Sequence, residues 1–283
     1  MTIDTDSQIL KKLDGQEKEE GTLPLLLQFY RQLLRIQSRA EGRISIPETA
    51  LRREAVMQRT ERGLPALNFN DLAPDWPLLQ DLFVEVTAAF AEYPQLFGEI
   101  PEPLKEPKAG RRLTKKAARA WFKGAELPPA LAGAASENIL QAIIHATLKP
   151  LLASYSRSLI GWVDLEHWRR GSCPICGGVP DFAFLETERG ARCLLCSRCD
   201  TEWGFQRLEC PYCGTRDQNA LAYFTDDEGL YRLYVCEQCK RYLKAIDLRQ
   251  AQAEVLLPLE RYYTLDLDAQ AQEQGYSPHH NPT

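Results

Sequence analysis

The first 172 of the 283 residues contain no cysteine, so this part of the chain offers no thiol for a disulfide or a thiolate metal site. Long hydrophobic runs are also missing. The most apolar stretch, residues 139–152, is interrupted by a histidine, a lysine and a proline, and it is shorter than the roughly 20 residues that span a bilayer. We therefore expect no membrane insertion.

The N-terminal segment lacks the apolar core of a secretory signal. Residues 1–20 are mostly polar and charged, whereas an export signal needs an apolar core of roughly 7–15 residues. We therefore expect a cytoplasmic protein. An excess of positive charge is absent too, because the formal net charge is −5. The chain as a whole thus has no electrostatic reason to gather on nucleic acid or on an anionic membrane.

Amphipathic helical patterns fill the cysteine-free part of the chain. Apolar residues recur every three or four positions, for example in LLLQFYRQLLRIQ, as a helix with one buried face requires. Pro150 should kink or break the last of these helices. Three prolines in residues 98–108 indicate a loop. Helices are predicted over residues 21–42, 47–61, 75–94, 113–123 and 135–160.

All nine cysteines lie between positions 173 and 239, and eight of them form C-x-x-C pairs. Two thiolates three positions apart can converge on one ion, and tetrahedral coordination takes two such pairs. Because cytosolic thiols are kept reduced, metal ligation is favoured over disulfides. The candidate metal ligands are Cys173 and Cys176, Cys196 and Cys199, Cys210 and Cys213, and Cys236 and Cys239.

The intervals between the pairs indicate which cysteines share an ion. Residues 177–195 and 214–235 each read as two strands around a glycine-containing turn. Each hairpin brings its flanking pairs together, so we expect the first pair to share an ion with the second, and the third with the fourth. A cross-braced pairing of the first with the third is the alternative. Gly177 and Gly214 permit the tight turn after two of the pairs. Cys193 is left over and is interpreted as a small buried residue.

Four-thiolate sites leave no position open for water or substrate, so their default role is structural. The ion is zinc, or iron as in rubredoxin, because sequence cannot separate the two metals. No recognisable catalytic constellation accompanies the cysteines, and we expect no enzyme activity. An electron carrier and a zinc ribbon that binds nucleic acid are the alternative functions. The second is disfavoured, since residues 169–216 hold seven Arg against six Asp or Glu.

The cysteine-rich half resembles the formate dehydrogenase accessory protein FdhE family. The resemblance rests on the four cysteine pairs in order, the TEW after the second pair, and the LDLD and GY of the C-terminal tail. It is close from about Trp168 to Tyr276, whereas in the helical half it is mainly LLLQFYRQLLRIQ. It implies a cytoplasmic factor that helps to assemble or activate respiratory formate dehydrogenase by contacting its catalytic subunit. It also implies two rubredoxin-like metal sites on the eight cysteines and self-association as a homodimer.

The predicted fold class is α+β. An N-terminal α-helical domain is followed by two rubredoxin-like or zinc-ribbon β modules and a short helical C-terminal tail. Knuckle loops and hairpin edges of the modules should meet the client, with Arg198, Asp200 and Glu202 as polar contacts and Tyr212 as an exposed aromatic anchor. The expected boundaries are 1–20 for a polar extension, 21–167 for the helical domain, 168–207 and 208–247 for the modules, and 248–283 for the tail.

Overall fold

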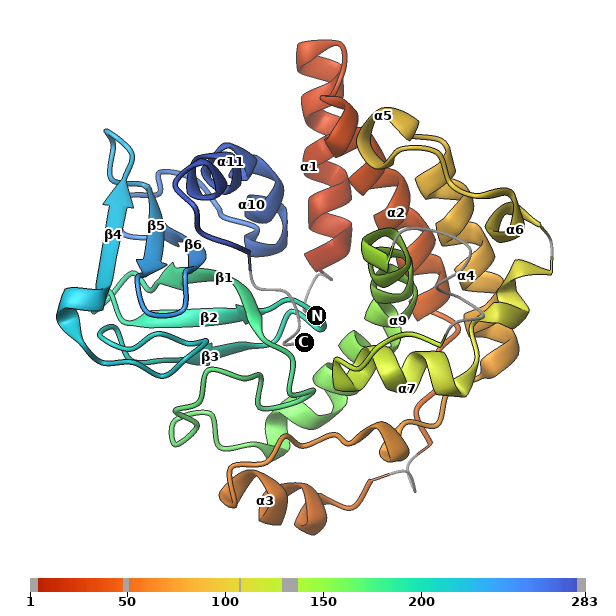
Figure 1. Ribbon diagram of the computed structural model, residues 1–283, viewed down its shortest axis with the longest axis horizontal. Coiled ribbons are helices and arrows are strands. Elements are labelled where there is room, and N and C mark those ends of the chain that lie inside the picture. The colour runs from red at the N-terminus through yellow and green to blue at the C-terminus, as the bar shows by residue number, and fades with distance from the viewer. Residues whose placement is uncertain (1–4, 48–50, 107, 129–136, 279–283) are drawn as a thin grey trace. The chain divides into compact units, whose positions relative to one another are not determined.

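The computed structural model of the chain, shown in Figure 1, describes residues 5–47, 51–106, 108–128 and 137–278. The described residues within 1–50 and 69–154 form one compact unit, and those within 51–68 and 155–281 form another. The predicted α+β class is confirmed, because helices fill the first unit and a sheet lies in the second. The domain boundaries expected from the sequence stay predictions. In the described ranges no helix is long and apolar enough to cross a bilayer.

The first unit is helical, as its apolar periodicity predicts. Residues 5–20, noted above only for their polarity, also form a helix, because Ile9 and Leu13 lie one turn apart and are both buried. The helices are α1 (Thr5–Glu20), α2 (Leu25–Glu41), α4 (Trp76–Ala91), α5 (Pro94–Phe97), α6 (Glu102–Lys105), α7 (Lys115–Lys123) and most of α9 (Glu137–Leu159).

Helices α2 and α4 pack around an aromatic cluster. The ring of Phe29 on α2 lies 4.9 Å from Phe90, 5.5 Å from Tyr93 and 4.5 Å from Phe97 in edge-on contacts. Edge-on geometry is the favoured one for such rings, because it sets a positive ring edge against a negative ring face. The periodic apolar residues of both helices therefore meet in one core.

Helix α9 continues through Pro150 without a break. A proline lacks the N–H that would bond to the carbonyl four residues earlier, so the carbonyl oxygen of Ala146 loses its helical partner. The buried side-chain amide of Gln37 donates to that oxygen at 2.7 Å. One side chain from α2 thus satisfies the group that the proline leaves open, and the break considered from the sequence does not occur.

The second unit is built on one six-stranded sheet of order β3-β2-β1-β6-β5-β4. Neighbouring strands are antiparallel except β1 and β6, which pair in parallel from Phe182 opposite Lys244 to Leu185 opposite Asp247. The two predicted modules thus share one continuous sheet. The strands are β1 (Pro180–Leu185), β2 (Arg192–Cys196), β3 (Glu202–Gly204), β4 (Leu221–Thr225), β5 (Tyr231–Cys236) and β6 (Arg241–Asp247).

Helices from both flanks of the cysteine region complete the second unit. The predicted helical tail is confirmed as α10 (Leu257–Tyr263) and α11 (Leu265–Glu273), which lie beside β6 in Figure 1. Leu257 packs into a core with side chains of β1, β2 and β6. Helix α3 (Arg53–Glu61) belongs to this unit although it precedes most of the first unit in the chain.

Candidate metal centres

The first cysteine quartet combines Cys173, Cys176, Cys196 and Cys199, whose sulfur atoms all lie within 4.8 Å of one another. The Sγ atoms of Cys173 and Cys199 are 3.7 Å apart, and those of Cys176 and Cys196 are 3.5 Å apart. The second quartet combines Cys210, Cys213, Cys236 and Cys239 within the same limit. There the Sγ distances are 3.7 Å for Cys210 with Cys239 and 3.7 Å for Cys213 with Cys236.

These distances fit a tetrahedral ion. A metal–sulfur bond of about 2.3 Å places neighbouring sulfurs of a regular tetrahedron about 3.8 Å apart. A disulfide would need about 2.05 Å, and all nine cysteines are free thiols. The structure therefore positions both quartets to bind metal ions, grouped in the sequential order that the hairpins predict. Ligation by these eight cysteines, and the metal itself, stay predictions.

All four cysteine pairs adopt the same turn. In each turn the backbone N–H of the residue after the second cysteine donates to the carbonyl of the first cysteine, at 2.8 to 3.3 Å. That residue has a positive φ each time, at 71° for Gly177, 54° for Asp200, 72° for Gly214 and 54° for Lys240. Glycine reaches this conformation without strain, whereas Asp and Lys do not. Glycine occupies this position after the first and third pairs, as the sequence predicts. After the second and fourth pairs the position is taken by Asp200 and Lys240, so the sequence does not reveal the same turn there.

The first quartet lies inside the second unit. Its cysteines are 0–4% exposed, and backbone N–H groups of Ile175, Gly178 and Arg198 each point at a ligand sulfur at 3.4 Å. Such donors stabilise thiolates, because they place partial positive charge against the sulfur. The hydroxyl of Thr201 lies 3.0 Å from the sulfur of Cys199 and 2.7 Å from the hydroxyl of Ser156. The site is thus closed by protein on several sides.

An upstream segment covers the first cysteine turn. The N–H of Ala66 donates to the carbonyl of Pro174 at 2.8 Å, and the N–H of Leu67 donates to that of Ile175 at 2.8 Å. Both donors are buried. Sequence reasoning placed residues 51–68 with the helical domain, because no cysteine or strand pattern marks this segment as part of the metal region.

Arg261 on α10 braces the turn of the second cysteine pair. It donates to the carboxylates of Asp181 at 3.0 Å and Asp200 at 2.6 Å, and to the carbonyl of Cys196 at 2.8 Å. The ion pair holds Asp200 in its positive-φ conformation. Sequence reasoning missed Arg261, since nothing in the tail signals a contact some 60 residues upstream.

The second quartet is more open. Cys210 and Cys236 are buried, but Cys239 is half-buried and Cys213 is exposed. Burial and the neighbouring thiols raise the pKa of Cys173 in the first quartet well above its ordinary value. Burial also acts to raise the pKa of Cys213, but the Thr215 amide and the neighbouring thiols outweigh it, and the pKa is lowered. The two quartets thus share a ligand set and differ in surroundings.

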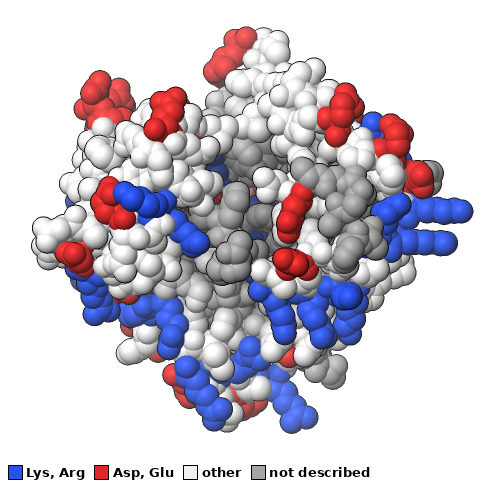
Figure 2. Space-filling model, in the orientation of Figure 1, with Lys and Arg blue, Asp and Glu red and all other residues white. Residues whose placement is uncertain are grey.

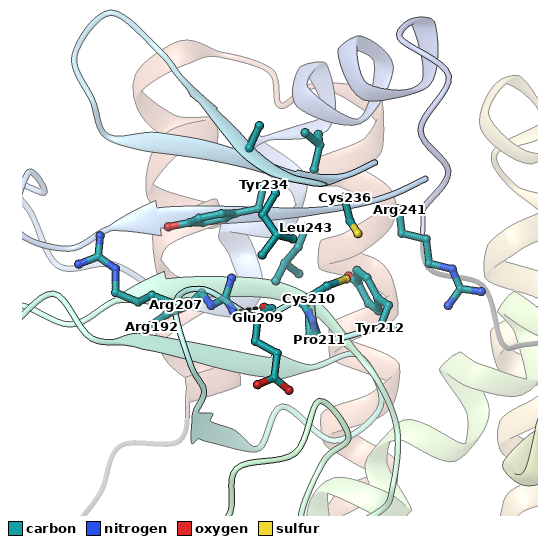
Figure 3. A pocket seen from close by; sticks show the side chains of 13 residues that line it. Arg192, Arg207, Glu209, Cys210, Pro211, Tyr212, Tyr234, Cys236, Arg241 and Leu243 are labelled. Carbon is teal, nitrogen blue, oxygen red and sulfur yellow. Dashed lines mark hydrogen bonds between the residues drawn. The ribbon is translucent and has the colours of Figure 1, made fainter. Parts of the chain in front are cut away.

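Figure 3 shows a cleft beside the second quartet, lined by Cys210 and Cys236 together with Leu221, Tyr234 and Leu243. In Figure 3 the ring of Tyr234 extends along the sheet, with its hydroxyl end directed away from Cys210. The wall formed by these side chains is largely apolar, so the cleft suits an apolar group.

The buried guanidinium of Arg192 also lines this cleft. It lies 5.3 Å from the ring centroids of both Phe205 and Tyr234, and it donates to the carbonyls of Gln206 and Glu209. Burial lowers its pKa. The cation therefore ties the segment between the two modules to the sheet.

The structure corrects the client surface expected from the sequence. Arg198 is 7% exposed, and Asp200 is paired with Arg261. Tyr212 is no exposed anchor, because its hydroxyl donates to the carbonyls of Pro180 and Tyr242, at 3.2 Å each. The prediction of a polar and aromatic docking surface on these residues is therefore wrong, although Glu202 is exposed. Side chains of the cysteine turns fold back onto the sheet, a contact that sequence separation alone does not reveal.

Cys193 stands outside both quartets. It lies on β2, is half-buried, and packs against the apolar cluster of Phe182 and Leu195. Burial raises its pKa to about 11. This agrees with its interpretation as a small packed residue.

Comparison with known proteins finds relatives of this chain in sequence and in structure. The sequence model described as "FdhE, central domain" matches residues 172–207. A "Protein FdhE homolog" from Aquifex aeolicus is 36% identical over 147 residues, 50% of this chain and 50% of that protein. A "Protein FdhE" from Escherichia coli O127:H6 is 29% identical over 139 residues, 47% of this chain and 44% of that protein. The chain thus spans about half the length of the curated relatives it matches.

The fold has a solved counterpart. The crystal structure of the FdhE protein from Pseudomonas aeruginosa matches with a TM-score of 0.61 over 99% of this chain and 92% of that one, at 24% identity. At this identity the match bears on the fold. The sequence matches confirm the resemblance to the FdhE family.

Proposed function

We propose, from the premise that this chain resembles the FdhE family, that it is a cytoplasmic accessory protein for the maturation or activation of respiratory formate dehydrogenase. It acts by contact with the catalytic subunit of that enzyme and has no catalytic activity of its own. The observation that carries the proposal is the match of the FdhE central domain to residues 172–207, which hold the first cysteine quartet.

The geometry supports a role for the metal ions in shaping a binding surface. Four cysteines saturate a tetrahedral ion, so substrate has no open coordination position. We assign one ion, iron or zinc, to Cys173, Cys176, Cys196 and Cys199, and one to Cys210, Cys213, Cys236 and Cys239. Zinc would supply cross-linking alone, and iron would add one-electron chemistry. The eight cysteines hold the strand ends and turns of the shared sheet in place.

Charge supports a protein partner over nucleic acid. The formal net charge is −5, and residues 169–216 hold seven Arg against six Asp or Glu. Strong binding to phosphates needs a basic stripe. The proposed partner is the catalytic subunit, and a homodimer is a further proposal that rests on the family resemblance.

The experiment is a gene deletion with complementation. Cells that lack the protein should make the polypeptides of respiratory formate dehydrogenase without formate-oxidising activity, and the wild-type gene should restore the activity. A purified catalytic subunit should bind the full-length protein in a pull-down with both components defined. Normal formate oxidation in the deletion strain would contradict the proposal.

One observation favours electron transfer as a second candidate function. The exposed Cys213 would bring the second ion close to solvent, and electron exchange with a partner needs a metal near the surface. Metal analysis and an absorption spectrum of anaerobically purified protein test this candidate. Two zinc ions per chain would eliminate it.

A further inference from the structure

Strand β4 forms one edge of the six-stranded sheet. It pairs with β5 on one side, and among the described strands none pairs with its other side. From Ala222 to Thr225 every residue of the strand is exposed, including the large side chains of Tyr223 at 53% and Phe224 at 49%. At the other edge of the sheet, β3 has only three residues.

The direction of the backbone groups of β4 follows from its ladder. The carbonyl of Ala220 accepts from the N–H of Glu237, and the N–H of Asp226 donates to the carbonyl of Tyr231. Hydrogen bonding alternates along an antiparallel strand, so the even-numbered residues between these points face β5. The N–H and C=O groups of Leu221, Tyr223 and Thr225 are therefore directed at the open edge.

This edge lacks the features that usually block strand addition. Proteins protect open edges with charged residues, prolines, bulges or very short strands. The segment LAYFT contains no charge and no proline, and its pairing with β5 is regular from Leu221 to Thr225. Its beginning borders the apolar cleft of Figure 3, which Leu221 and Ala222 help to line.

Aromatic contacts fix the exposed ring of Tyr223. The ring lies 5.6 Å from that of Tyr234 on β5, and the guanidinium of Arg232 lies 5.1 Å from its centroid. Arg232 in turn pairs with the buried Asp247 at 2.7 Å. A ring held in this way loses little conformational freedom when a partner packs on it, as in the aromatic anchors of protein interfaces.

Acidic residues flank both ends of β4. Asp217 precedes the strand, and Asp226, Asp227 and Glu228 follow it. Figure 2 shows acidic side chains at the tip of the β4–β5 hairpin. The nearest cation before the strand, Arg216, is already paired with Glu209 at 2.7 Å. A segment laid along β4 would therefore meet negative charge at each end.

We propose that β4 is a docking strand that takes up an extended segment of the client polypeptide as a seventh strand, and that this segment has an apolar centre with basic residues on both sides. Main-chain hydrogen bonds at Leu221, Tyr223 and Thr225 supply affinity, and the flanking acids select the charge of the segment. This inference rests on the proposed function, because it names the surface that meets the client.

The same charges disfavour a second copy of this chain as the occupant. In an antiparallel pair of two β4 strands centred on Tyr223, the acidic turn of one copy lies beside residues 217–219 of the other, where Asp217 repels it. A segment with lysine or arginine at its ends meets attraction at both positions.

The test uses the full-length, metal-loaded protein and a synthetic peptide of alternating valine and threonine with two lysines at each end. Calorimetry should detect binding of this peptide. A peptide with glutamates in place of the lysines should bind at least about tenfold more weakly. Hydrogen exchange at the amides of Tyr223 and Thr225 should slow when the lysine peptide is bound.

Two substitutions at one position isolate the backbone contribution. Tyr223→Ala removes the aromatic ring and keeps the backbone N–H. Tyr223→Pro removes the ring and the N–H, and because this N–H faces the open edge, no hydrogen bond to β5 is lost. We expect affinity to fall about threefold for the first variant and at least about tenfold further for the second.

Asp227→Gln with Glu228→Gln should also weaken binding of the lysine peptide, while Glu188→Gln in the turn of the other hairpin should leave it unchanged. Unaltered metal content and melting temperature show that each variant is folded.

Three outcomes would overturn the inference. They are failure of the lysine peptide to bind, equal binding by the Ala and Pro variants, and a dimer of the wild-type chain that Tyr223→Pro dissociates. If the purified catalytic subunit binds wild type and Tyr223→Pro equally, the docking strand is wrong and the accessory function stands. If the deletion strain oxidises formate normally, the accessory function fails whatever the peptide does.

Discussion

The two cysteine quartets have the same ligands and the same turns but different surroundings. In the first, all four cysteines are at most 4% exposed, and amide donors, Thr201 and the segment of Ala66 and Leu67 surround them. In the second, Cys213 is exposed and Cys239 is half-buried. Closure of a thiolate site thus depends less on its ligands than on the chain segments that the fold brings over them.

The difference has a consequence for metal exchange. A chelator or an incoming thiol must reach the ion or a ligand sulfur, and only an exposed cysteine offers that path. We therefore infer that the first site is a permanent cross-link and that the second exchanges its ion. The two sites have the same ligands but should differ in the rate at which they exchange their ions.

Replacement of a ligand should have the largest effect. Cys173→Ser should remove one metal equivalent and lower the free energy of unfolding of the second unit by more than about 4 kcal/mol, because a buried site loses its cross-link. Cys213→Ser should also remove one metal equivalent but should lower the free energy of unfolding by only about 2 kcal/mol. Metal analysis and denaturant titration measure both quantities.

A double variant serves as the control for pairing. Cys173→Ser combined with Cys196→Ser should keep one metal equivalent, because both residues belong to the same quartet. Loss of both equivalents in this variant would mean that the ligand grouping is different.

Removal of an ion pair beside each quartet should have the next largest effect on the free energy of unfolding, and the effect should differ between the two quartets. Arg261→Met removes the ion pairs with Asp181 and Asp200, in which the arginine side chain is 11% exposed, and should lower the free energy of unfolding by about 3 kcal/mol. Arg216→Gln near the second quartet removes an ion pair in which the arginine side chain is 69% exposed. Since exposed ion pairs contribute little, that change should stay below about 1 kcal/mol. Equal losses in thermal unfolding would show that the two surroundings are equivalent.

Backbone strain in the turns gives a smaller effect of opposite sign. Lys240→Gly should stabilise the protein by up to about 1 kcal/mol, because glycine adopts the positive φ of 54° without strain. Asp200→Gly relieves the same strain but removes the ion pair with Arg261, so it should destabilise. A rise in melting temperature for Asp200→Gly would contradict the role given to Arg261.

Cys193, which belongs to neither quartet, should show the smallest effect. The pKa of Cys193 is about 11, above the usual value of about 8.5, so the fold favours its neutral thiol. Its contribution to stability is complete below about pH 8.5 and is lost as the pH rises toward 11. Alkylation of Cys193 by iodoacetamide in the metal-loaded protein should therefore be slow at pH 8 and rise about tenfold per pH unit. A rate that is flat over this range would contradict its burial.

Local patterns in the sequence predicted most of the longer helices, the hairpins and the grouping of the cysteines, but they missed α1 and the short α6, which lies in the segment expected to be a loop. Each depends on a repeat that neighbouring residues reveal, such as the three-to-four spacing of α2 or the turn between two strands. Continuity of α9 through Pro150 could not be predicted in this way, because it depends on the bond from Gln37 to Ala146, which lie 109 residues apart.

Long-range contacts account for the parts that sequence reasoning missed. The parallel pairing of β1 with β6 joins two modules that look independent in the sequence. The cover of Ala66 and Leu67 on the first quartet, and the contact of Tyr212 with Tyr242, have no local signature either. These contacts determine how exposed each quartet is. The ligands could therefore be predicted from the sequence, whereas the difference in exposure between the two quartets could not.

A time course of metal release tests the difference in exchange rate most directly. The metal-loaded wild-type protein is mixed with an excess of a chromogenic chelator at neutral pH, and released metal is recorded. We expect two phases that release one equivalent each, with the fast phase at least about tenfold faster than the slow one and absent from Cys213→Ser. A single phase that releases both equivalents, or a fast phase that survives in Cys213→Ser and vanishes in Cys173→Ser, would contradict this expectation.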